Sequence, residues 1–138
     1  MAIQDAPARR HARARIAVQS SEAETYDRTD GAALMEVRIR ETFTGDMEGE
    51  STVRALQAQG DGGTANMVSQ QRFCGALDGR KGAFVLQGFE TVADGAVKGT
   101  WFVVPGSGAG ELTGLRGEGG FEGRFGEGSR GTLDYWFE

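Results

Sequence analysis

Glycine does more than any other residue to limit the folds open to this chain. The 138 residues include 23 glycines but only two prolines. Most of the glycines separate short runs of Val, Ile, Leu, Phe and Trp, and Asp-Gly or Gly-Gly pairs occur at residues 60–63, 78–79 and 94–95. Such pairs adopt positive φ at low cost and suit tight hairpins. The pattern therefore predicts many short antiparallel strands joined by tight turns.

Eight segments have the length and composition of strands, and no segment reads as a long helix. We expect residues 21–32 to form a polar loop and residues 105–116 a glycine-rich connection with at most one short helical turn. The expected strands are 14–20, 33–44, 48–58, 63–74, 82–92, 96–104, 117–125 and 130–137.

Alternation along these strands predicts one apolar and one polar face for most of them. In 33–44 the odd positions are mainly apolar, whereas the even positions include three charged side chains. Strands of this kind close into a barrel or stack as a sandwich, and closure removes exposed edges. We therefore expect an all-β fold, a small antiparallel eight-stranded β-barrel. The residues expected on its inner face include Met67, Phe73, Val85, Phe89, Trp101 and Phe121.

Charge is distributed unevenly along the chain. The net charge is −5, but residues 1–15 carry four arginines against one aspartate, so the remainder is strongly acidic. An acidic body repels phosphates, and we expect no nucleic-acid partner. We interpret residues 1–13 as a flexible basic arm and residues 14–138 as a single barrel domain.

Few side chains are suited to metal or nucleophilic chemistry. Cys74 is the only cysteine and His11 the only histidine, so we expect no metal site, no disulfide and no cofactor. His11 lies outside the expected barrel, which leaves a Ser or Cys nucleophile without a base. No apolar run approaches the length of a membrane span and no signal peptide is evident, so we expect a cytoplasmic protein with no membrane partner.

Several polar residues fall on the expected inner face, namely Glu41, Ser69, Gln71, Gln87 and Tyr135. Burying one such group without a partner costs about 1–3 kcal/mol. Either they form an internal hydrogen-bond network, or they face a ligand in a barrel just wide enough for one small molecule. In an apolar pocket Glu41 would have a raised pKa and could transfer protons. Apolar ligand walls would come from Trp101, Phe73, Phe89, Met67 and Phe121.

Four segments together resemble the bacterial family DUF3224, a domain family of unknown function. They are FTGDMEGE (43–50), GALDGRKGAFVLQ (75–87), GTWFVVPGSGAGELTGLRGEG (99–119) and LDY (133–135), and the resemblance covers about residues 33–137. Gln87 and Trp101 match the family's pattern, whereas Gln71 stands where an acidic residue is expected and Ala109 replaces a threonine.

That family is similar to the allene oxide cyclase barrels and, more distantly, to dirigent proteins. The resemblance implies an eight-stranded barrel with an interior cavity, acting as a cofactor-independent isomerase or cyclase on a small hydrophobic or aromatic ligand. Glu41 would carry a proton, while Gln87, Gln71 and Tyr135 would orient an oxygen of the substrate. Two alternatives remain open: a non-catalytic binding protein with the same cavity, and a homo-oligomerising structural domain whose interior is filled by its own side chains.

Overall fold

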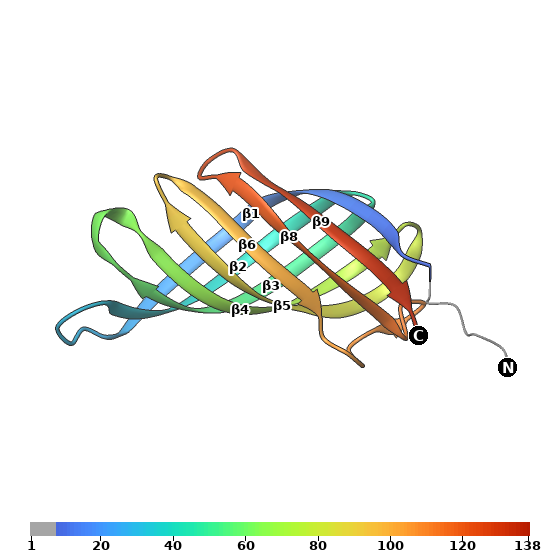
Figure 1. The fold of residues 1–138 in the computed structure, drawn as a ribbon, viewed down its shortest axis with the longest axis horizontal. Coiled ribbons are helices and arrows are strands. Elements are labelled where there is room, and N and C mark those ends of the chain that lie inside the picture. Colours follow the sequence, from blue (N-terminus) through green and yellow to red (C-terminus); the bar gives the residue numbers. More distant parts are fainter. Residues whose placement is uncertain (1–7) are drawn as a thin grey trace, which may run out of the picture.

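The structure, a computed structural model, describes residues 8–138 as one antiparallel sheet closed on itself (Figure 1). The strands lie in the order β4-β3-β2-β1-β9-β8-β6-β5-β7, and pairing between β4 and β5 completes the ring. The prediction of an eight-stranded antiparallel barrel is confirmed, β7 being a two-residue addition. The elements are β1 (Arg10–Asp27), β2 (Ala33–Gly45), β3 (Met47–Gln59), η1 (Asp61–Gly63), β4 (Ala65–Leu77), β5 (Arg80–Ala93), β6 (Ala96–Val103), β7 (Ala109–Gly110), β8 (Leu115–Arg124) and β9 (Gly128–Phe137).

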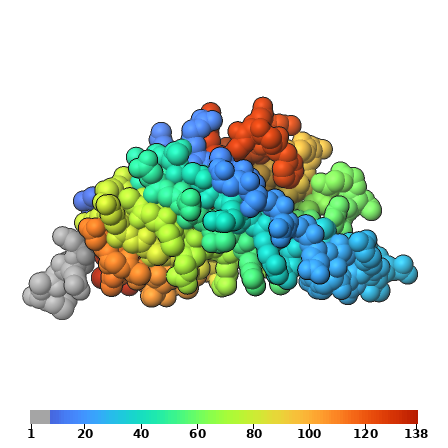
Figure 2. All heavy atoms as spheres, turned by 180° about the vertical axis from the view of Figure 1, so that it is seen from behind, coloured from blue at the N-terminus to red at the C-terminus, as the bar shows by residue number. Residues whose placement is uncertain are grey.

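The first strand is longer at both ends than the sequence suggested. Residues 10–13, expected in the arm, pair with β9, and residues 21–27, expected in a loop, pair with β2. Side chains 17–24 are all exposed, so this stretch has no buried face and shows no alternation of apolar and polar residues. The β1–β2 hairpin accordingly projects beyond the rest of the barrel (Figures 1 and 2). Residues 1–7 of the expected arm lie outside the described residues.

The Asp-Gly pairs at 78–79 and 94–95 form tight hairpins, as predicted, whereas Asp61–Gly63 form the short 3-10 helix η1 in the longer β3–β4 connection. Asp78 and Gly79 have φ of 47° and 84°, and Asp94 and Gly95 have φ of 53° and 74°. Left-handed backbone at both central positions is the type I′ turn, which matches the twist of paired strands. Residues 105–116 contain β7 and turns but no helical turn. No helix among residues 8–138 is long and apolar enough to span a membrane.

The apolar core fills the end of the barrel where β1 begins and β9 ends. Leu112, in the connection before β8, is fully buried and helps to close this end. Phe73 packs against Phe43 and Phe84, with ring centroids 5.3 and 5.1 Å apart. The other buried members of this core are Ala12, Ala14, Ile16, Met47, Leu77, Leu86, Trp101, Val103, Leu115, Leu133 and Tyr135.

Strand β5 faces the opposite way from the sequence interpretation. Its buried side chains are at even positions, among them Phe84, Leu86 and Glu90, whereas Phe89 is 67% exposed. The two-residue turn at 78–79 is the cause. It pairs Leu77 with Arg80, so each inward odd residue of β4 lies opposite an even residue of β5, and directly opposed residues share a face. The predicted inward placement of Val85, Gln87 and Phe89 is wrong.

Candidate functional site

Five polar side chains gather on the inner face of strands β2–β5. Four of them are buried, with solvent-exposed fractions of 4% for Ser51, 8% for Ser69, 6% for Gln71 and 6% for Glu90. Glu41 is partly buried and lies directly opposite Ser51 in the β2–β3 pairing. We call these five residues the polar cluster. A packed barrel interior ordinarily consists of apolar side chains, so a cluster of this size needs internal partners or a ligand.

Hydrogen bonds satisfy part of the polar cluster. The Ser51 hydroxyl donates to Oε1 of Gln71 at 2.6 Å, and the Ser69 hydroxyl donates to Oε2 of Glu90 at 2.9 Å. Among residues 8–138 no fully buried side-chain nitrogen or oxygen lacks a partner, yet no side-chain hydrogen bond in this part of the chain involves Glu41. The Glu41 carboxylate is therefore the member of the cluster that solvent or a ligand can reach.

The two glutamates hold protons more tightly than exposed carboxylates do. The pKa of Glu41 is raised from 4.5 to about 7, mainly by burial and to a smaller extent by the negative charge of the nearby Glu90 carboxylate. Burial also raises the pKa of Glu90 to about 6, although the hydrogen bond from Ser69 acts in the opposite direction. Two like charges in one poorly solvated space favour keeping one proton between them. Between about pH 6 and about pH 7 the pair is therefore mainly one acid and one carboxylate.

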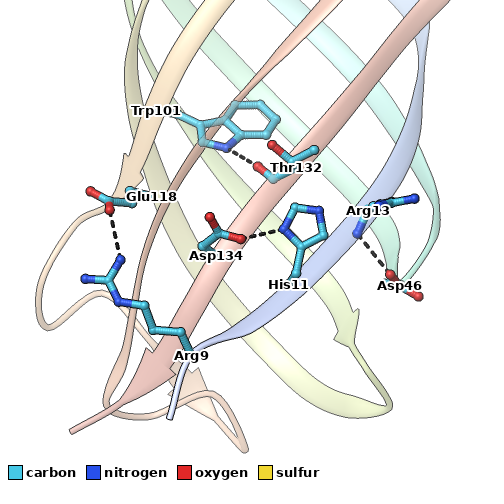
Figure 3. Close-up of polar contacts among 8 residues, drawn as sticks. All are labelled: Arg9, His11, Arg13, Asp46, Trp101, Glu118, Thr132 and Asp134. Atoms are coloured by element: carbon cyan, nitrogen blue, oxygen red, sulfur yellow. Dashed lines mark hydrogen bonds and ion pairs between the residues drawn. The ribbon is translucent and has the colours of Figure 1, made fainter. Parts of the chain in front are cut away.

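Aromatic rings line the interior from the core to the polar cluster. Trp101 lies between Phe43 and Phe121, with ring centroids 6.4 and 5.2 Å away. Its indole Nε1 donates to the carbonyl of Thr132 at 2.9 Å (Figure 3). Because this bond uses the only polar atom of the ring, Trp101 presents purely apolar surface to the interior.

A glycine on β6 brings Phe121 and Glu90 together. A Cβ at Gly99 would lie 2.5 Å from Cε1 of Phe121 and 3.1 Å from Cγ of Glu90. Gly88, between Leu86 and Glu90 on β5, leaves similar room, because a Cβ there would lie 3.0 Å from Oε2 of Glu90. Two side-chain-free positions thus create the space in which a carboxylate sits beside an aromatic ring.

The barrel end opposite the core is less completely filled. Met35, Ile39 and Met67 face inward by alternation but are only partly buried. The Gln57 amide donates to the sulfur of Met35 at 3.6 Å in the same region. Since these inward side chains remain partly accessible, we infer that solvent enters from this end and reaches Glu41.

The structure brings together many of the residues predicted for the site. Glu41, Ser69 and Gln71 belong to the polar cluster, and Met67 precedes Ser69 on the same face of β4. Trp101, Phe73 and Phe121 lie inside the barrel with the core. These placements agree with the expected inner face; the functional roles of the residues stay predictions.

Three other predicted residues do not join the cluster. Gln87 lies on the outer face, where its Oε1 accepts a hydrogen bond from the Gln70 amide at 2.9 Å. Phe89 is exposed on the same outer face. Tyr135 is buried, but its hydroxyl donates to Asp78 in the β4–β5 turn at the core end. Burial and this bond raise the pKa of Tyr135 to about 12, so it stays protonated.

Sequence reasoning missed two members of the polar cluster, Ser51 and Glu90. With Val85, Gln87 and Phe89 expected to point inward, alternation leaves Glu90 on the outer face, and the two-residue turn before β5 is the signal that corrects this. Ser51 carries no pattern of its own and is recognisable only through its bond to Gln71. Within residues 8–138 no three His, Cys, Asp or Glu side chains are grouped so as to hold a metal ion.

Comparisons with known proteins agree with this architecture. The chain is similar to a crystal structure of a protein of unknown function from Shewanella oneidensis MR-1, with 30% identity, a TM-score of 0.76, and coverage of 96% of this chain and 98% of that one. A search of curated proteins found no match. The model of the family described as "Protein of unknown function (DUF3224)" matches residues 12–138, more than the 33–137 expected, and the chain belongs to that family.

Proposed function

We propose that the barrel takes up a small, neutral, mainly apolar molecule and catalyses its isomerisation or ring closure by proton transfer, without a cofactor. The observation that carries the proposal is the glutamate pair inside the barrel. Glu90 is held by Ser69, while Glu41 has a raised pKa and no hydrogen-bond partner in the described chain. In this respect the protein would act like the allene oxide cyclase barrels, a relationship that the family resemblance leads us to expect.

A carboxyl group with a pKa near 7 is suited to reversible proton transfer at neutral pH. Both its acid and its base form are well populated, so Glu41 can remove a proton from one carbon and return it to another. The second carboxylate, Glu90, keeps the pair from losing both protons together. Such a reaction needs no redox partner, because the product has the same composition as the substrate.

The surroundings of the pair favour a neutral ligand. Met67, Trp101 and Phe121 supply apolar contact, and a substrate oxygen could accept a hydrogen bond from the Gln71 amide, whose oxygen is already bonded to Ser51. An anionic ligand would be repelled by the glutamates and would lose its hydration without a cationic partner. Positioning a flexible neutral molecule against Glu41 would lower the entropic part of the barrier.

The experiment pairs a binding probe with a proton-transfer substrate. Fluorescence of N-phenyl-1-naphthylamine, a neutral aromatic probe, reports binding in the barrel, and the absorbance change of a β,γ-unsaturated cyclic ketone reports its conversion to the conjugated isomer. We expect the wild-type protein to bind the probe and convert the ketone. Glu41→Gln should retain binding and lose at least 100-fold in rate, as is usual for loss of a general acid–base group.

The matched control is Glu50→Gln, the same change at an exposed position of β3. It should leave both binding and rate unchanged. Equal rates for Glu41→Gln, Glu50→Gln and wild type would remove the catalytic part of the proposal. Binding without conversion of any substrate of this class would instead favour the non-catalytic binding protein.

A second candidate function, self-association, rests on the outer face of β3–β5. Leu56, Val68 and Phe89 are 53%, 46% and 67% exposed, and they lie directly opposite one another in neighbouring strands. A row of exposed apolar side chains is typical of a protein interface. Analytical ultracentrifugation should show a dimer for wild type and a monomer for Val68→Lys; a monomeric wild type would contradict this candidate.

A further inference from the structure

The outer face of the barrel carries a groove that the polar cluster does not reach. It crosses β2, β1, β9, β8 and β6 and has a volume of about 790 Å³, within the range of small-molecule sites. We call it the outer groove. Its lining consists of Arg13, Ala14, Arg15, Thr44, Gly45, Asp46, Lys98, Gly99, Gly120, Phe121, Glu122, Arg130, Gly131 and Thr132.

The charge of the outer groove is opposite to that of the whole protein. Its lining holds four basic and two acidic side chains, on a chain with a net charge of −5. One of the two acids is already engaged, since Oδ2 of Asp46 accepts the backbone N–H of Arg13 at 2.9 Å (Figure 3). The ion pairs found among residues 8–138 include none of the four basic side chains of the groove.

Two of these basic residues oppose each other directly. Arg15 on β1 is the register partner of Arg130 on β9. Like charges in directly opposed positions destabilise a sheet. The other acid, Glu122, lies opposite both Arg130 and Lys98 in its own pairings but does not come within ion-pair distance of either. An anion held between the two guanidinium groups would relieve their repulsion.

The floor of the groove is bare backbone. Gly120 occupies an outward position of β8 between Glu118 and Glu122, and a Cβ there would lie 2.3 Å from the carbonyl oxygen of Gly99. The absence of a side chain leaves space between the arginines of β1 and β9 and the lysine of β6. A compact group can therefore approach all three strands at once.

We propose that the outer groove binds a small molecule that carries a phosphate-type dianion. Each guanidinium offers a planar fork of donors, and a tetrahedral phosphate has enough oxygens for two forks at once, whereas one carboxylate does not. The inference is independent of the proposed catalytic function. The interior site is anionic and favours neutral molecules, and the outer groove is cationic.

Titration with inorganic phosphate and with phenyl phosphate, followed by ¹H–¹⁵N NMR at low salt, tests the proposal. We expect saturable shifts confined to the amides of Arg13, Arg15, Gly120 and Arg130, with tighter binding of either phosphate than of benzoate. Arg15→Gln and Arg130→Gln should each raise Kd about tenfold, the loss expected for one charge-assisted contact. Arg72→Gln, the same change at an exposed position of β4, should leave Kd unchanged.

Two results of the titration would overturn the proposal. One is the absence of saturable shifts at tens of millimolar phosphate; the other is an equal effect of all three arginine substitutions, which would indicate a general response to net charge. Thermal unfolding is a second measurement, and it also shows whether each variant is folded. Without ligand, Arg15→Gln should raise the midpoint of thermal unfolding by removing the Arg15–Arg130 repulsion, and phosphate should raise the midpoint of that variant less than it raises the midpoint of wild type. Unchanged midpoints with and without phosphate in every variant, wild type included, would also contradict it.

Discussion

Replacing Glu41 by glutamine should make the protein more stable, by an amount that grows with pH. Glu41 has a pKa of about 7 in the folded protein against an ordinary 4.5. At a pH between these two values, the folded state therefore keeps a proton on Glu41 that the unfolded state has released. The contribution of Glu41 to stability is therefore fully present below about pH 4.5 and is lost as the pH rises through about 7.

The size of the effect follows from the same two pKa values. Moving a carboxyl pKa from 4.5 to about 7 corresponds to about 3 kcal/mol, at about 1.4 kcal/mol for each pH unit. Glutamine does not titrate. We compare the free energy of unfolding of Glu41→Gln with that of wild type. The excess of the variant over wild type should be about 3 kcal/mol larger at pH 8 than at pH 4.

Urea unfolding followed by tryptophan fluorescence is a suitable assay, because Trp101 is 4% exposed in the core and becomes solvated on unfolding. Glu50→Gln, at an exposed position on β3, is the control and should show no such pH dependence. A stability difference between Glu41→Gln and wild type that is constant from acid to alkaline pH would refute the reasoning. So would an ordinary carboxyl pKa for Glu41 measured by NMR.

Three further predictions follow from the interior. In Glu90→Gln the pKa of Glu41, measured by NMR, should fall below about 7, because a neighbouring negative charge is removed; no change would mean that the two carboxylates do not interact. Trp101→Phe loses the bond to Thr132 and part of the ring contact, and should lower the free energy of unfolding by about 1–3 kcal/mol in guanidinium. Gly49→Ala places a Cβ 2.2 Å from a backbone carbonyl of β4, so it should cost about 3 kcal/mol or more, and a melting temperature equal to wild type would contradict the close approach.

Much of the fold could be predicted because barrels follow from local rules. Alternation of apolar and charged residues in β2 predicts which side chains point inward, and the Asp-Gly pairs at 78–79 and 94–95 predict where the chain reverses. The second half of β1 was missed because it lies in a hairpin exposed on both faces, where burial imposes no pattern on the sequence.

The candidate site was harder to predict than the fold. Strand β5 carries apolar residues on both faces, with Phe84 and Leu86 inside and Phe89 outside, so alternation alone could not orient it. The length of the preceding turn does orient β5, because across a two-residue loop each odd-numbered residue of one strand pairs with an even-numbered residue of the next. Applied to this chain, that rule places Glu90 inside and Gln87 outside. The bond between Ser69 and Glu90 follows from the register, because Glu90 lies diagonally across from Ser69. The proximity of Glu41 does not, because β2 and β5 are not paired and approach each other only in the closed barrel.

The seam between β1 and β9 has a consequence for how the protein folds. Residues near opposite ends of the chain, such as Arg10 and Tyr135, are register partners there. The ring therefore stays open until its final strand has been made, and the contacts that seal it have the largest loop-closure cost. Topologies of this kind fold over milliseconds to seconds rather than microseconds. A growing chain would meanwhile expose the unpaired edge of β1, and that edge is where association between nascent copies would begin.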